Sequence, residues 1–372
     1  MLIQSKRLLS LDVFRGITIA AMILVNTIVL SPYKILEHAE WHGCTLADLV
    51  FPFFLIVVGM SLALSTTKLL KNGASKRSIV YKIVKRSMII FILGLLLNLF
   101  PYHMSGDTLL TVRVYGVLQR IALCYFFSAL AYLYLNTAMQ ILCALVLLIG
   151  YWVIMIYYPI PGYGVGDVSL GGNLGAYLDR WLFPAANLYG KIYDPEGLLS
   201  TLPAIASTLL GNITGIWLLS HHSQPRKCFG MLLAGLTVMV LGWYWGKWFP
   251  INKALWTSSY VLWTGGIALI VYTFCYVTIE MRHWTRWSKP FEIFGLNAIL
   301  VYFLHVLFFK IQLMIHVKCG YFKTCNLRQI ILQDLFGWTS LPYASLYYAI
   351  SSVLFWLLVL TILYRRKIFI RI

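Results

Sequence analysis

Apolar residues dominate the chain in continuous runs, which short polar segments separate. Each run is about 20 residues long, enough for a helix that crosses the hydrocarbon core of a bilayer. The runs lack the alternation over about ten residues that marks a strand of a transmembrane β-barrel. We therefore predict an all-α polytopic membrane protein, a bundle of about ten transmembrane helices at 11–30, 46–66, 82–100, 117–135, 138–157, 199–219, 229–248, 256–279, 291–315 and 342–364.

The composition agrees with a chain that crosses the membrane many times. Of its 372 residues 60% are hydrophobic and only 11% are charged, whereas soluble domains contain about 25% charged residues. The net charge of +18 invites a nucleic-acid interpretation. However, the basic residues fall between the apolar runs, where the positive-inside rule explains them better. We expect the lipid bilayer as a partner and no nucleic acid.

The distribution of charge also predicts an orientation. An even number of spans places both termini on one side, and most Lys and Arg residues fall in segments on that side. Cytoplasmic loops are enriched in these residues, so we expect both termini in the cytoplasm. The long segment 158–198 is then an outer loop that joins two five-helix halves, 1–157 and 199–372, of a single domain. It is rich in Gly, Asn and Tyr beside acids, which suits a sugar, although a simple cap over the bundle explains it as well.

Polar residues gather around the outer loop between the first two runs. Asn26 lies near the outer end of the first run, His38 in the loop, and Asp48 at the start of the second run. A histidine can act as base, nucleophile or acyl carrier, a fixed amide can donate to an oxyanion, and a carboxylate can orient the imidazole. These three are the catalytic candidates. The alternative for Asn26 is a hydrogen bond between helices, the commoner role of an intramembrane asparagine.

A second set of polar residues lies mostly toward the predicted outer side. Arg120 lies inside the predicted hydrocarbon boundary and needs a partner, with snorkelling to the surface as an equal alternative. Asn297 and His305 stand two turns apart on one face of the expected helix 291–315, where an interhelical hydrogen bond is the simpler interpretation. The candidates for substrate binding, which include two acids of the long outer loop, are Arg113, Gln119, Arg120, Asp179, Glu196, Asn297 and His305.

Basic residues also mark the predicted inner side. Arg15 stands at the start of the first run, and Lys85 and Arg86 lie at the inner end of the third. Such residues could attract a polyphosphate, since Arg and Lys both bind phosphate groups, but they are mostly a topology signal. They are the candidates for binding such a polyphosphate.

The seven cysteines show no metal-ligand spacing, so we expect no metal. Cys319 and Cys325 share one loop and could form a disulfide in an oxidising compartment. A pair of unbonded thiols fits the sequence equally well.

Seven motifs, spread in order along the chain, resemble those of one family. They are LDVFRG at 11–16, VN at 25–26, HAEWHGCTLADLVFPFFLIVVG at 38–59, GVLQR at 116–120, GGNLGAYLDR at 171–180, DPEGLLSTLPAI at 194–205 and GLNAILVYFLH at 295–305. Together they resemble bacterial relatives of heparan-alpha-glucosaminide N-acetyltransferase, a transmembrane acyltransferase family.

The resemblance implies a reaction. Cytosolic acetyl-CoA would reach a site on the periplasmic side of the bacterial inner membrane and acetylate the amine of a glucosamine-type sugar. The family's functional asparagine, histidine and aspartate fall on Asn26, His38 and Asp48. The sequence departs from the lysosomal enzyme at His42, which stands in Trp41-His42-Gly43 where that enzyme has Trp-Asn-Gly. The acceptor is therefore an amino sugar of open identity.

Two other functions fit the same residues. An amino-sugar permease would need the same outer loop and buried polar side chains but no acetyl-CoA. An O-acyltransferase of envelope glycans would accept a hydroxyl group in place of the amine. The order of the chemical steps and the oligomeric state, including a possible homodimer, stay open.

Overall fold

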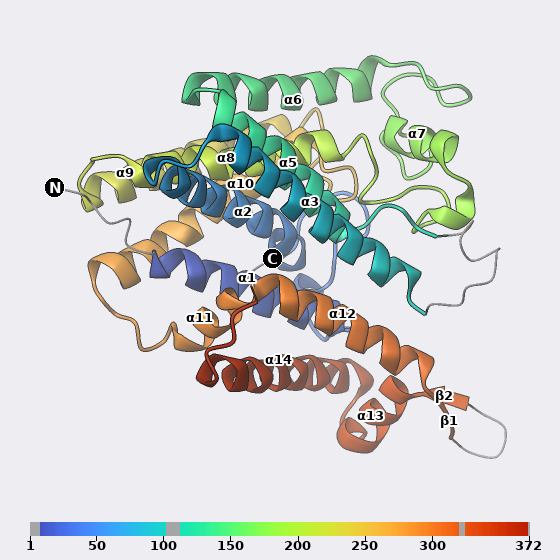
Figure 1. Cartoon of the computed structure of the whole chain (residues 1–372). Helices are drawn as coiled ribbons and strands as arrows, with labels where there is room; N and C mark the ends of the chain where they lie inside the picture. Colours follow the sequence, from blue (N-terminus) through green and yellow to red (C-terminus); the bar gives the residue numbers. More distant parts are fainter. Residues whose placement is uncertain (1–7, 102–111, 320–323, 371–372) are drawn as a thin grey trace. The chain divides into compact units, whose positions relative to one another are not determined.

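The apolar runs fold into long helices, as their length and periodicity predict. The computed structural model describes residues 8–101, 112–319 and 324–370, and Figure 1 labels the elements. The helices of the first half are α1 (Leu9–Thr27), α2 (Leu46–Lys71), α3 (Lys76–Leu99), α5 (Val117–Tyr134), α6 (Thr137–Tyr157) and α7 (Leu174–Leu182). Those that follow are α8 (Thr201–Leu219), α9 (Gln224–Trp245), α10 (Ser258–Tyr276), α11 (Lys289–Leu296), α12 (Ala298–Met314), α13 (Leu327–Phe336) and α14 (Leu341–Arg365).

Short elements complete the described chain. Two 3₁₀ turns lie at Lys34–Leu36 and Ala185–Asn187, and a π-helical turn at Val277–Met281 continues α10. The strands β1 (His316–Lys318) and β2 (Thr324–Asn326) form an antiparallel pair in which Val317 faces Cys325. This hairpin is a small exception to the expected all-α fold.

Eight helices in the described part of the chain are long and apolar enough to cross a membrane, and the bent pair α11 and α12 raises the number to nine if it forms one span. The structure therefore supports a multi-pass membrane protein, with fewer clear spans than the ten expected. Helix α3 covers nearly all of the expected span 82–100. It is not among the eight, because Lys82, Lys85 and Arg86 place too many charges in its first half for a membrane-spanning helix.

The expected continuous helix 291–315 is wrong. The chain bends by 81° between α11 and α12, and Asn297 at the break has the non-helical angles φ −123° and ψ 37°. The Asn297 side chain instead bonds the C-terminal backbone, donating to Ile368 O at 3.3 Å and accepting from the Ile370 N–H at 2.9 Å. Asn297 and His305 consequently do not share one helix face, because only His305 belongs to α12.

The described residues fall into two compact units. The larger unit comprises residues of 1–11, 40–44 and 52–283, and the smaller unit comprises 12–39, 45–51 and 284–372. Both of the five-helix halves expected from the sequence contribute residues to the larger unit.

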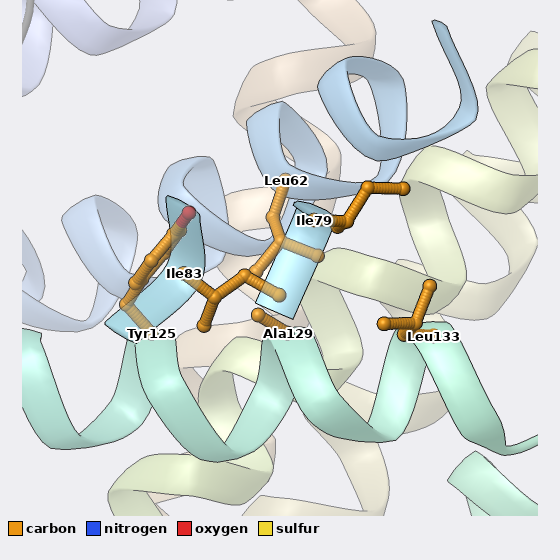
Figure 2. Close-up of a cluster of buried hydrophobic side chains, with 6 residues drawn as sticks. All are labelled: Leu62, Ile79, Ile83, Tyr125, Ala129 and Leu133. Carbon is orange, nitrogen blue, oxygen red and sulfur yellow. The ribbon is translucent and has the colours of Figure 1, made fainter. Parts of the chain in front are cut away.

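In the larger unit, α2, α3 and α5 pack through a cluster of buried side chains, which Figure 2 shows converging between the helices. The cluster consists of Leu62, Ile79, Ile83, Tyr125, Ala129 and Leu133. Ile79 and Ile83 are one turn apart, so they present one apolar stripe to α5. Lys76 and Arg86 lie on the same side of α3, over the rings of Tyr134 and Tyr125.

In the smaller unit, α1 and α11 approach until their backbones touch. A Cβ atom added at Gly16 would lie 1.7 Å from Phe291 O, and one added at Gly295 would lie 1.9 Å from Asp12 O. Only glycine fits at these two positions, so the motifs LDVFRG and GLNAILVYFLH meet at a crossing that excludes side chains.

The loop between α12 and α13 carries a disulfide. The structure joins Cys319 to Cys325, which closes the β1–β2 hairpin in the smaller unit. Of the two alternatives that the sequence left open, the structure therefore takes the bonded one.

Candidate active site

Asp48 is the centre of the candidate active site. It lies in the first turn of α2 and is 1% exposed. Its Oδ1 lies 2.7 Å from His38 Nδ1. Its Oδ2 accepts from the backbone N–H groups of Ala39 at 3.1 Å and Thr45 at 3.0 Å, and from Thr45 Oγ1 at 3.1 Å. These donors and the positive end of the α2 dipole hold the carboxylate in place and stabilise its negative charge.

His38 is oriented by this carboxylate. An ionised carboxylate can only accept hydrogen bonds, so the Nδ1 atom of His38 carries the proton and donates it to Asp48. The neutral ring then has its lone pair on Nε2. The His38 side chain is 46% exposed, so an exposed imidazole is paired with a buried carboxylate. This is the arrangement in which a histidine acts as a general base or nucleophile.

Asn26 lies on the last turn of α1, also in the smaller unit. Its side chain is exposed and makes no hydrogen bond with the described residues. The structure thus gives no support to the alternative of a bond between helices. Asn26 can offer its amide to another molecule, which is what a donor to an oxyanion requires.

The segment between His38 and Asp48 belongs partly to the larger unit. There Trp41 Nε1 donates to Val168 O at 2.9 Å, and Gly43 N donates to Ile251 O at 2.7 Å. His42 Nδ1 lies 3.4 Å from Asn252 Nδ2, and partial burial lowers the pKa of His42. Residues 40–44 are therefore anchored to the segments before α7 and before α10.

Four of the substrate-binding candidates come together in the larger unit. Arg113 donates through Nε and Nη2 to the two oxygens of Asp194, at 2.7 and 2.6 Å, and also pairs with Glu196. The Arg113 guanidinium stacks over the ring of Tyr189 at 4.9 Å. These two carboxylates raise the pKa of Arg113, although burial of the group opposes them.

Asp179 lies against the same cluster. It is 2% exposed, and its Oδ2 accepts from the Asp194 N–H at 3.4 Å. The carboxylate of Asp179 and the hydroxyl of Tyr115 interact within this cluster. Burial, followed by the negative charge of Asp194, raises the pKa of Asp179 to about 6. Asp179, Asp194 and Ser200 line a small cavity.

Arg120 is buried in the larger unit, so the alternative of snorkelling is wrong. It is 1% exposed. Its Nη2 donates to Gly197 O at 3.3 Å and to Ser200 Oγ, and the guanidinium lies 5.1 Å from the Trp256 ring centre. The segment just before α8 thus supplies hydrogen-bond partners for the buried guanidinium of Arg120. The Nε and Nη1 atoms of Arg120 make no hydrogen bond with described residues.

The other candidates lie apart from these clusters. Gln119 is buried against Gly94 and Gly116, with no hydrogen bond from its Nε2 to a described residue. His305 is 3% exposed, and its ring packs edge-on to Trp356 at 6.3 Å. Asn297 bonds the C-terminal segment, as described above. The surroundings of Gln119, His305 and Asn297 therefore do not indicate that these residues bind a substrate.

The candidates for nucleotide binding divide between the units. Arg15, in the smaller unit, donates to Asp12 Oδ1 at 3.0 Å and to Gly295 O at 3.2 Å, so it also fastens the crossing of α1 and α11. Lys85 and Arg86, in the larger unit, lie on α3, where Lys85 is exposed and Arg86 lies 4.8 Å from the ring centre of Tyr125.

Sequence reasoning missed several residues of these clusters. Asp194 was only one outer acid among others, yet it is the buried partner of Arg113. Its place at the start of the motif DPEG was the available signal. Arg328, on α13, donates to Thr27 O beside Asn26, and nothing in the sequence pattern marked it. In the described ranges no group of three or more His, Cys, Asp or Glu side chains could hold a metal ion.

These features define a class of protein: a multi-pass membrane protein with a histidine–aspartate pair at the start of a helix. Residues 7–231 match the family model described as "Heparan-alpha-glucosaminide N-acetyltransferase, catalytic". The chain belongs to this family of acetyltransferases.

Two relatives that carry the family's name extend the match beyond the catalytic region. The chain is 30% identical to the human heparan-alpha-glucosaminide N-acetyltransferase over 357 residues, which cover 81% of this chain and 53% of the human protein. It is 29% identical to the mouse protein over 354 residues, with 81% and 54% covered. The chain spans about half the length of these curated relatives.

Proposed function

We propose that the protein transfers an acetyl group from cytosolic acetyl-CoA to the amine of a glucosamine-type sugar on the periplasmic side of the bacterial inner membrane. The observation that carries the proposal is the His38–Asp48 pair, in a chain that belongs to an acetyltransferase family. A membrane site suits this reaction because coenzyme A is polyanionic and does not cross a bilayer unaided, whereas the acceptor lies outside.

His38 is the group that takes up the proton. In the direct route, Nε2 of His38 removes a proton from the amine as its nitrogen bonds to the acetyl carbonyl carbon. The carbon–sulfur bond then breaks, and the coenzyme A sulfur leaves as the thiol after it receives that proton. Asp48 accepts from Nδ1 throughout, so it stabilises the imidazolium that forms between the two proton transfers.

A two-step route uses the same residues. Nε2 of His38 attacks the thioester carbon, coenzyme A leaves as the thiolate, and an acetyl-imidazolium forms with its Nδ1 proton kept. The amine then attacks this acetyl group, the proton that its nitrogen loses passes to the thiolate, and neutral His38 is regenerated. Trapping of a labelled acetyl group on His38 distinguishes this route from direct transfer.

Asn26 stabilises the charge that develops on the acetyl oxygen. Both routes pass through a tetrahedral intermediate with an oxyanion. The exposed amide of Asn26 has no hydrogen bond to described residues that it would have to break first. One such donor typically contributes about 3–4 kcal/mol to the transition state.

The remaining candidates bind the two substrates. Arg113, Arg120, Asp179 and Glu196 are assigned to the acceptor, and their clustering in the larger unit supports this. Gln119, Asn297 and His305 are weaker members of this set. Arg15, Lys85 and Arg86 are assigned to the phosphates of acetyl-CoA, since guanidinium and ammonium groups bind phosphate.

The test is acetyl transfer by the purified protein in proteoliposomes, with acetyl-CoA enclosed and the acceptor outside. We expect N-acetylglucosamine to form from glucosamine, and no product from N-acetylglucosamine, whose amine is blocked. Acetylation of N-acetylglucosamine would instead indicate an O-acyltransferase. Uptake of glucosamine without any need for acetyl-CoA would indicate a permease.

A further inference from the structure

The outer end of α1 is held by side chains from the last third of the chain. Thr27 is the final residue of α1, and its carbonyl is among those that a helix leaves without an internal partner. Arg328 Nη2 donates to this oxygen at 2.5 Å. The next turn of backbone is held as well, since Ser345 Oγ accepts from the N–H groups of Val29 at 2.8 Å and Leu30 at 3.4 Å.

Arg328 is itself fixed in position. It follows Asn326, which begins α13 with a capping box shared with Gln329. The Leu327 N–H donates to Ile315 O at 2.8 Å, which ties the start of α13 to the end of α12. The first turn of α13 therefore has little freedom, and the guanidinium reaches Thr27 from a rigid base.

The surroundings of Arg328 are unusual for a structural arginine. It is 9% exposed, and burial lowers the pKa of its guanidinium. The group lies over the rings of Phe309 at 4.6 Å and Tyr348 at 5.9 Å, and no ion pair in the described ranges includes it. Its Nε is buried and makes no hydrogen bond with a described residue. A buried cation without a carboxylate is costly to keep, which indicates a role beyond packing.

That role follows from the neighbour of Thr27. Asn26 precedes Thr27 on the same helical turn. An amide that donates to an oxyanion must be held within a fraction of an ångström of its productive position, yet the last turn of a helix tends to fray. The positive charge at the helix C-terminus and the hydrogen bond to Thr27 O both oppose fraying.

We propose that Arg328 is a positioning residue for acetyl transfer, which holds the last turn of α1 so that the Asn26 amide meets the oxyanion. The inference rests on the proposed function, since it assumes that Asn26 donates to the tetrahedral intermediate. Arg328 acts through Asn26, so its contribution exists only while the Asn26 amide is present.

A double-mutant cycle tests this dependence. The variants are Arg328→Met, Asn26→Ala and the two combined, measured by kcat and KM for acetyl transfer to glucosamine. We expect Arg328→Met to lower kcat about 10- to 100-fold with KM changed less than threefold. In the Asn26→Ala background it should lower kcat less than twofold. Arg180→Met is the matched control, because that half-buried arginine also donates to a backbone carbonyl, of Ile192.

Each result decides a different claim. An equal loss of kcat in both backgrounds, or no loss in either, overturns the role of Arg328. Wild-type kcat in Asn26→Ala alone overturns the assignment of Asn26 under the proposed function. If Arg328→Met does not fold, Arg328→Lys serves in the same cycle, because lysine keeps the charge and a donor. We then expect Arg328→Lys to lower kcat two- to tenfold when Asn26 is present and to leave kcat unchanged in the Asn26→Ala background. An equal loss in both backgrounds would again overturn the proposal.

Discussion

The Nδ1 atom of His38 lies 2.7 Å from the Oδ1 atom of Asp48, whose other oxygen accepts from the backbone on both sides of residues 40–44. One carboxylate thus fixes the tautomer of the imidazole and closes the loop that carries it. Oδ1 of Asp48 orients His38, and Oδ2 holds the loop. Different substitutions of Asp48 should therefore affect catalysis and loop folding to different degrees.

Replacement of Asp48 by Asn should remove most of the activity while the loop remains closed. The asparagine keeps one oxygen for the backbone donors, but it presents no negative charge to His38 and can favour the wrong tautomer. By analogy with the aspartate of a catalytic triad we expect kcat to fall about 100- to 10,000-fold. Asp48→Ala should also lower stability by about 1–3 kcal/mol, because backbone donors lose their acceptor. Steady-state kinetics and thermal unfolding of both variants check this, and unchanged kcat in Asp48→Asn would contradict it.

Replacement of Gly295 by Ala should disrupt the smaller unit. The new Cβ would lie 1.9 Å from Asp12 O, and a clash with backbone cannot be relieved by a change of rotamer. We expect loss of several degrees in the melting temperature, or no folded protein in detergent. Gly150→Ala is the control, since nothing lies within 4 Å of its added Cβ and alanine is the better helix former. Equal melting temperatures for the two variants would refute the close crossing of α1 and α11.

Replacement of Arg113 should destabilise the larger unit more than an exposed arginine would. The Asp194 side chain is 0% exposed and would remain as a buried charge without its partner. Removal of one member of such a buried pair costs about 3–5 kcal/mol. Arg113→Lys should recover part of this, because lysine keeps the charge but loses the two-pronged geometry. Thermal unfolding measures this, and we expect the melting temperature to fall from wild type to Arg113→Lys and further to Arg113→Ala.

The pH dependence of stability should reveal Asp179. Its pKa is about 6 in the folded protein, above the ordinary value of 3.8, because of burial and the charge of Asp194. The folded state therefore binds this proton more tightly than the unfolded state, and the stability it contributes below about pH 4 is lost as the pH rises to about 6. The shift corresponds to up to about 3 kcal/mol.

Asp179→Asn isolates this effect. We expect the variant to melt above the wild type at pH 7 and close to it at pH 4.5. A difference between the two melting temperatures that does not change with pH would show that Asp179 does not titrate in this range.

Much of the helix pattern could be predicted from the sequence because it follows from local hydrophobicity. The His38–Asp48 contact was also within reach, since a short loop returns the start of α2 towards the end of α1. The bend at Asn297 was not, because it depends on two distant contacts. Gly295 meets the backbone of α1, and the Asn297 side chain bonds residues 368–370. No window of local sequence contains these partners.

The partners of the arginines were equally hidden. The position of Arg120 within an apolar run predicts that it needs a partner, but the partners lie about 80 residues further along, at Gly197 and Ser200. Arg328 stands in a polar stretch, where an arginine is not unusual. Its role is indicated only by its contact with Thr27 in the folded structure. The sequence shows which polar groups need partners, whereas the choice of partner depends on tertiary packing.

The central claim is that His38 carries the chemistry of acetyl transfer. Single-turnover transfer of a labelled acetyl group from acetyl-CoA to glucosamine tests it most directly, with His38→Ala compared with His42→Asn. His42 lies in the same loop and contacts Asn252 rather than Asp48. We expect His38→Ala to fold normally but to transfer no acetyl group above background, and His42→Asn to transfer it at close to the wild-type rate. A wild-type rate in His38→Ala would contradict the account.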